Sequence, residues 1–149
     1  MTSLFSTLAV ITTGLYAGFM LTFLIAVMPG LAALPDDGFT AAMRRFNEKV
    51  PGPAFLVLFI GVIAFPAVTV FTELDEKRWP LVAVAMACAV VSHLVTIGGN
   101  IPLNKALAEA EGGDDSAARK AFEGPWNGFH RFRTALSLAA FVLLAAAVL

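Results

Sequence analysis

Four long apolar stretches, separated by polar segments, set the pattern of this chain. Each approaches the roughly 17 to 25 residues that an α-helix needs to cross the hydrocarbon core of a bilayer at about 1.5 Å per residue. The last stretch is the shortest, and it becomes long enough if its helix starts upstream of Thr134. The pattern predicts an all-α integral membrane four-helix bundle, one domain over residues 1–149, with spans at about 4–28, 54–71, 81–97 and 130–149.

The first loop has a periodicity of its own. Its apolar residues recur four, three and four positions apart, at Phe39, Met43, Phe46 and Val50. This spacing predicts a short amphipathic helix that lies at the membrane interface, and we expect Asp36 or Asp37 to cap its start. We interpret this helix as a surface anchor, and a lid over a site is the alternative.

Glycines and prolines mark three further features of the spans. Gly14 and Gly18 form a GxxxG pair, which predicts close approach of another helix and permits homo-oligomerisation. Pro29-Gly30 should kink or end the first helix, and Pro66 should bend the second span. The third loop breaks at its Gly112-Gly113 pair, and we expect its acidic residues to form a solvated face.

Composition agrees with a membrane protein and narrows its partners. Of the 149 residues, 58% are hydrophobic and 14% are charged, and the mean hydropathy is +0.81. The net charge of -1 and the lack of a dense basic block favour a lipid bilayer as partner and argue against nucleic acid. Cys88 is the single cysteine, so the chain forms no intramolecular disulfide.

The positions of lysine and arginine predict the orientation in the membrane. The second loop carries only Lys77 and Arg78, whereas the first and third loops carry more. Positive residues concentrate in cytoplasmic loops, so we expect loops one and three to be cytoplasmic and both termini to lie on the other side. The basic residues of loops one and three are Arg44, Arg45, Lys49, Lys105, Arg119, Lys120, Arg131 and Arg133.

Two polar stripes flank the third loop. On a regular α-helix, His93, Asn100 and Asn104 project within about 40° of one another. A second stripe, spaced four, three and four residues apart, consists of Trp126, His130, Arg133 and Ser137. Because neighbouring helices joined by a short loop are antiparallel, we expect the two stripes to line one pocket between spans three and four.

The residue types of these stripes suit an aromatic, oxygen-bearing ligand. Amides, a guanidinium and an imidazole at an apolar boundary offer hydrogen bonds beside a hydrophobic wall. His93 lies about 10 Å deeper than Asn100 along the helix axis. An ionisable group at that depth is a functional candidate, and a neutral histidine bonded to a neighbouring helix is the equal alternative.

The motifs that carry these stripes resemble the DUF1772, or anthrone oxygenase-like, family of small four-helix membrane proteins. They are Asn100-Ile101-Pro102-Leu103-Asn104 at the end of the third span and Trp126-x-x-x-His130-x-x-Arg133-Thr134 at the start of the fourth. The resemblance implies oxidation of an anthrone to an anthraquinone with O2, a hydrophobic aromatic small molecule as substrate, and an integral protein of the bacterial plasma membrane.

Within that chemistry the site residues receive roles. We expect His130 to take a proton from the substrate as the catalytic base, and Arg133 to stabilise the resulting oxyanion. Asn100 and Asn104 should bind the substrate oxygens, and Trp126 should stack on its rings. No cofactor is required, and a copper or iron ion held by His93 and His130 is the alternative.

A non-enzymatic class competes with this hypothesis. The polar stripes would then only join helices, and the chain would be a non-catalytic small membrane subunit, a scaffold or a transporter component.

Overall fold

The computed structural model describes residues 4–72 and 78–148, and every element in this part of the chain is helical. Four helical stretches are long and apolar enough to cross a membrane, so the predicted all-α membrane bundle is confirmed. Most of the second loop lies outside the described residues. The elements are α1 (Leu4–Thr22), η1 (Phe23–Val27), α2 (Met28–Ala32), α3 (Asp36–Lys49), α4 (Pro53–Thr72), α5 (Trp79–Val95), η2 (Thr96–Asn100), α6 (Ile101–Glu109) and α7 (Asp115–Val148).

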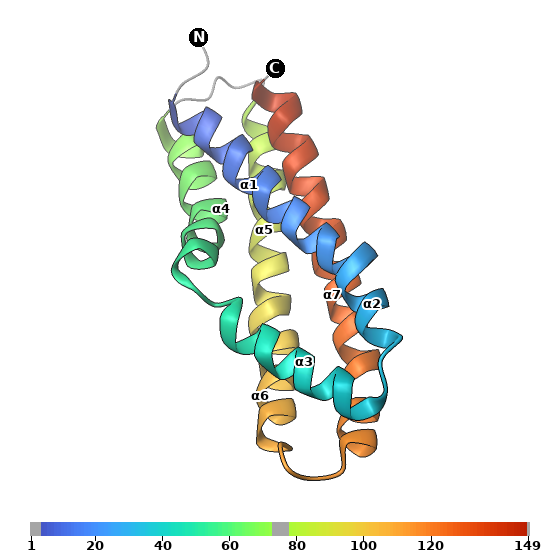
Figure 1. Cartoon of the computed structure of the whole chain (residues 1–149). Coiled ribbons are helices and arrows are strands. Elements are labelled where there is room, and N and C mark those ends of the chain that lie inside the picture. Colours follow the sequence, from blue (N-terminus) through green and yellow to red (C-terminus); the bar gives the residue numbers. More distant parts are fainter. Residues whose placement is uncertain (1–3, 73–77, 149) are drawn as a thin grey trace.

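The long helices run side by side, and α3 crosses them near one end (Figure 1). The α6–α7 turn lies at this same end, whereas both termini lie at the other. Helix α7 packs against α1 and α5, and α4 packs against the same two helices. Three of the four apolar helices extend well beyond their predicted spans, as Leu4–Ala32, Trp79–Glu109 and Asp115–Val148. Most of the third loop is therefore helical, as continuations of spans three and four on the two sides of Gly112-Gly113.

The core divides into two clusters with different side chains. Towards the termini the buried residues are mostly small, with Ala9, Ala85, Ala89 and Ala140 among them, which lets the helices approach closely. A Cβ on Gly14 would come within 2.8 Å of the Phe141 ring, whereas one on Gly18 would meet nothing within 4 Å. Only the first glycine of the pair therefore serves contacts within the chain. Towards α3 the buried residues are large: Phe23, Met28, Leu31, Phe39, Met43, Leu107, Phe122 and Trp126.

Two π-helical turns interrupt the long helices. In η1 the Met28 N–H bonds to the Phe23 carbonyl, and in η2 the Ile101 N–H bonds to the Thr96 carbonyl. The first helix continues through Pro29-Gly30 to Ala32, so its irregularity precedes the proline and does not end the helix there. A π-turn holds one residue more than an α-turn and shifts the later side chains by about 100° around the axis.

Helix α3 is the predicted amphipathic helix, and its apolar face is buried in the protein. Phe39 and Met43 are fully buried, and Phe46 stays partly exposed. The predicted aspartate cap is wrong: Pro35 occupies the cap position, and Asp36 and Asp37 lie inside the first turn, where their charge suits the helix dipole.

Ion pairs fix α3 to the α6–α7 turn. The buried Arg44 donates to the Leu107 carbonyl at 2.9 Å and to the Asp115 carboxylate at 3.2 Å. Arg119 donates to Asp36 at 3.1 Å and to the carbonyls of Ala32 and Leu34. The third loop is thus not simply a solvated face. Its acidic residues form the ion pairs Arg44–Asp115, Arg45–Glu111 and Lys105–Glu109.

Candidate functional site

A cavity of about 170 Å³ lies inside the half of the bundle that α3 covers. Spans three and four form one side of it, and spans one and two with the end of α3 form the rest. An apolar cavity of about 150 Å³ holds a benzene ring, so this one has room for an aromatic ring. Its lining residues are Phe19, Met20, Phe23, Asn47, Val50, Pro51, Phe55, Leu56, Phe59, Thr96, Asn100, Ile101, Asn104, Trp126 and Arg133.

A wider hollow of about 420 Å³ adjoins this cavity on the side of the α3–α4 connection. Phe19, Val50 and Phe55 line both spaces. The Phe19 and Phe55 rings lie 5.7 Å apart, centroid to centroid.

Arg133 is the charged side chain of the cavity. It is 7% exposed, and its Nε–H donates to His130 Nδ1 at 3.1 Å. Its Nη1 donates to Thr96 Oγ1 at 3.1 Å, and the guanidinium lies 5.3 Å from the centre of the Trp126 ring. Among the described residues no carboxylate pairs with it. Arg133 therefore keeps N–H groups and an uncompensated charge for a ligand.

His130 lies behind Arg133 and is not part of the cavity wall. Its ring is fully buried and stacks on Trp126 at 4.7 Å between centroids. Because Nδ1 accepts the hydrogen bond from Arg133, Nε2 carries the ring hydrogen and donates to the Met20 carbonyl at 3.1 Å. Both nitrogens are thus engaged, and a proton can reach Nδ1 only when the bond to Arg133 opens.

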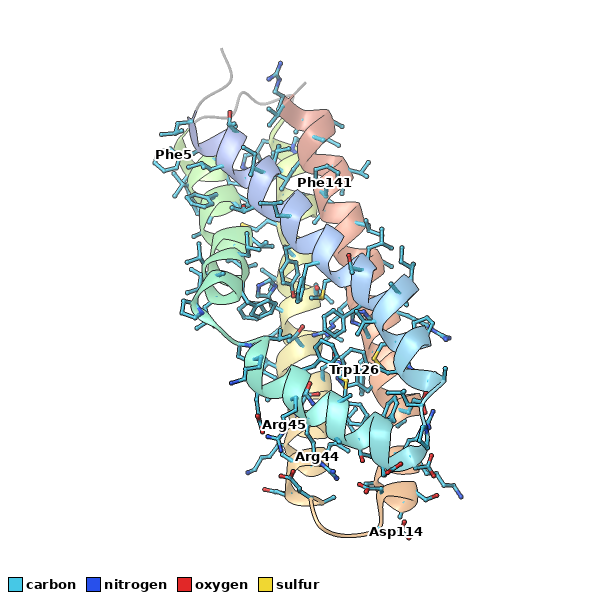
Figure 2. The ribbon with its side chains drawn as sticks, in the orientation of Figure 1. Phe5, Arg44, Arg45, Asp114, Trp126 and Phe141 are labelled. Atoms are coloured by element: carbon cyan, nitrogen blue, oxygen red, sulfur yellow. The ribbon has the colours of Figure 1, made fainter. Side chains whose placement is uncertain are left out.

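Trp126 and the two asparagines line the cavity together. Trp126 lies in the half of the bundle that carries α3 (Figure 2). Its indole Nε1–H donates to Asn104 Oδ1 at 2.9 Å, which fixes the plane of the ring. Asn100 Nδ2 donates to the Trp126 carbonyl at 3.2 Å, which leaves Asn100 Oδ1 buried and without a partner among the described residues.

His93 does not join this site. The π-turn η2 separates it from Asn100, so the regular α-helical projection that grouped His93 with Asn100 and Asn104 is wrong. Its Nε2 lies 2.7 Å from the Phe59 carbonyl and its Nδ1 lies 2.8 Å from the Ala89 carbonyl. The ring also stacks on Phe59 at 3.9 Å, so the contacts of His93 join α5 to α4.

The two histidines do not fit a copper or iron ion in this arrangement. Each ring nitrogen of His93 faces a backbone carbonyl, and those of His130 contact Met20 and Arg133. A ligating imidazole needs one nitrogen free to face the metal. Over residues 4–72 and 78–148, three or more His, Cys, Asp or Glu side chains nowhere gather into a candidate metal site.

Sequence reasoning missed Asn47 of α3 and Thr96 of η2, which both line the cavity. Asn47 follows Met43 by four positions and precedes Val50 by three, so it lies on the apolar face of α3. Its amide Nδ2 is buried without a partner in the described structure. A polar residue in register with an apolar stripe was the available signal.

A family model described as anthrone oxygenase matches residues 39–143 of the chain. This range includes α3 from Phe39 onwards, both polar stripes and the cavity residues from Asn47 onwards, and it leaves out Phe19, Met20 and Phe23. No curated protein and no solved structure matches the chain.

Proposed function

Because the chain belongs to the anthrone oxygenase family, we propose that its cavity binds an aromatic ketone of the anthrone type and promotes its oxidation by O2. The anthrone lies with its rings against Trp126 and the phenylalanines of spans one and two. Its ketone oxygen faces Arg133, beside Asn100 and Asn104.

The single observation that carries this proposal is that Arg133 is buried and has no carboxylate partner among the described residues. A buried cation with only neutral partners is costly, and an anionic oxygen in the cavity compensates it. An anthrone supplies such an oxygen, because removal of a proton from its CH2 group places negative charge on the ketone oxygen. Arg133 then stabilises this enolate more than the neutral ketone, and that difference accelerates proton loss.

The overall reaction is balanced without a cofactor. The electron-rich enolate reacts with O2 at the carbon that lost its proton. One oxygen atom of O2 becomes the oxygen of the new carbonyl group. The other leaves as water with the two hydrogen atoms of the former CH2 group. The protein supplies a dry apolar pocket, a flat stacking surface and a fixed positive charge, and no step needs a bound metal.

His130 holds Arg133 in place in this proposal. Its hydrogen bond to the Met20 carbonyl orients the ring, and Nδ1 then fixes the Nε end of the guanidinium. The role of base, predicted from the sequence, requires that the bond between His130 and Arg133 opens. We also expect the α3 end of the bundle to face the cytoplasm, as the lysine and arginine pattern predicts.

Oxygen uptake by membranes that contain the protein tests the proposal, with emodin anthrone as substrate. We expect uptake above that of control membranes, and a loss of about a hundredfold or more in kcat on Arg133→Ala. Arg131→Ala is the matched control, because Arg131 lies two positions away on the same helix and is exposed. An Arg133→Ala variant with unchanged uptake would refute the proposal, and absence of uptake in the unmodified protein would favour a non-catalytic membrane subunit.

A further inference from the structure

We propose that Asn47 and Asn100 together hold one hydroxyl group of the ligand and so determine which ligands the cavity prefers. The inference rests on the proposed function, because it takes the cavity as the substrate site. It assigns a binding role to Asn47, which lies on α3, and a specific acceptor to Asn100, which lies in η2.

The orientation of the Asn100 amide is fixed by the protein. Its Nδ2 group donates to the Trp126 carbonyl, so the oxygen atom must be the free end. The residue is 1% exposed, and Oδ1 is buried without a partner among the described residues. A buried acceptor without a donor is unfavourable, and a ligand that brings an O–H group relieves it.

Asn47 presents the complementary group. Its Nδ2 is a buried donor that has no acceptor in the described structure. Helix α3 is held against the α6–α7 turn by the Arg44–Asp115 and Arg119–Asp36 ion pairs. The protein therefore fixes the helix that carries this donor before any ligand arrives.

One hydroxyl group satisfies both asparagines, since it donates to Asn100 Oδ1 and accepts from Asn47 Nδ2. A carbonyl or an ether at the same place satisfies only Asn47. The separate oxygen that Arg133 binds must be an acceptor, because a guanidinium has donors only. The preferred ligand is therefore a flat aromatic ketone that also carries a hydroxyl group.

Three anthraquinone dyes, which the proposed reaction does not convert, distinguish the contribution of Asn47 from that of Asn100. The first is an anthraquinone with one hydroxyl group at a position not adjacent to a carbonyl, so that no internal hydrogen bond holds its O–H. The second is its methyl ether, and the third is unsubstituted anthraquinone. The full chain is placed in lipid nanodiscs with the exposed Trp79→Phe substitution, which leaves Trp126 as the single tryptophan and quenching reporter.

We expect the hydroxyl compound to bind about tenfold more tightly than its methyl ether, as one hydrogen bond to a buried acceptor provides. Asn100→Ala should make the two compounds bind equally. Asn47→Ala should weaken the hydroxyl compound and the ether alike, by about tenfold. Unsubstituted anthraquinone should bind all variants equally, which shows that each cavity is intact.

Asn127→Ala is the matched control, because Asn127 is absent from the cavity wall. Equal binding of the hydroxyl compound and the ether to the unmodified protein would overturn the inference, and so would a lack of quenching by all three dyes. Equal losses on Asn47→Ala and Asn127→Ala would overturn the role of Asn47. The assay contains no turnover, so selective binding without oxygen uptake would refute the proposed reaction and leave the asparagine pair in place.

Discussion

The arginines at the α3 end of the bundle and the arginine beside the cavity have opposite electrostatic surroundings. At the α3 end, the Arg44 side chain is 6% exposed and that of Arg119 is 16% exposed, and each bonds to a carboxylate. Beside the cavity, Arg133 is 7% exposed, and its hydrogen bonds within the described part of the chain go to His130 and Thr96. Arg44 and Arg133 are therefore buried to a similar extent, and Arg119 is half-buried. The partners of these arginines differ.

This difference indicates what the α3 end and the cavity each contribute to the protein. A buried arginine with a carboxylate and carbonyls around it is satisfied, and it holds elements together. A buried arginine among neutral groups is preorganised for a charge that is not yet present. The α3 end therefore holds α3 in place, and under the proposed function the buried charge of Arg133 costs stability and serves ligand binding.

Paired substitutions to methionine test this division most strongly. Arg133→Met should abolish oxygen uptake, yet it should lower the Tm in detergent less than Arg119→Met, because removal of an uncompensated charge offsets the lost hydrogen bonds. Arg119→Met should lower the Tm, since it removes bonds to Asp36, Glu123 and two carbonyls. Burial alone predicts the reverse order of Tm, and finding that order would contradict the comparison.

Substitutions of His130 distinguish a base from a residue that positions Arg133. In His130→Asn, the amide oxygen takes the place of Nδ1 and still accepts from Arg133 Nε, but it does not take a proton at neutral pH. If His130 only positions Arg133, His130→Asn should keep kcat within about tenfold of the unmodified protein, whereas His130→Ala should lose about a hundredfold. Equal losses in both variants, with the pH dependence of kcat abolished, would establish the base instead.

The hydrogen bonds from Arg119 to the α2–α3 turn can be tested without an activity assay. Arg119→Ala frees the carbonyls of Ala32 and Leu34, so amide hydrogen exchange around residues 33–39 should accelerate by about tenfold or more. Lys120→Ala is the control, because Lys120 is exposed and next in sequence. Unchanged exchange in Arg119→Ala would show that the apolar face of α3 holds the turn alone.

Much of the fold could be predicted from local patterns. Spans and the amphipathic α3 follow from hydrophobic periodicity, which depends on neighbouring residues only. The stripe Trp126, His130, Arg133 and Ser137 is buried on one face because α7 is regular there. Their assignment to catalysis and binding stays a prediction.

The site itself required the three-dimensional arrangement. The π-turn Thr96–Asn100 moves His93 off the face of Asn100, and only its Gly98-Gly99 pair marks it in the sequence. Asn47 reaches the cavity because α3 folds back over the bundle, and that packing depends on ion pairs between residues far apart in the chain. Periodicity along α3 places Asn47 on its apolar face, but it reveals neither which part of the bundle this face covers nor the π-turn in span three.

The π-turn η2 contains two glycines with different surroundings. A Cβ on Gly99 would lie 2.8 Å from the Phe129 ring, whereas a Cβ on Gly98 would meet nothing within 4 Å. Gly99→Ala should therefore push η2 away from α7, cost about 1–3 kcal/mol and weaken dye binding by displacing Asn100. Gly98→Ala should be neutral or slightly stabilising, because alanine favours the helix. Equal effects of the two variants on Tm and on Trp126 quenching would show that the position of Asn100 does not depend on the close contact between Gly99 and Phe129.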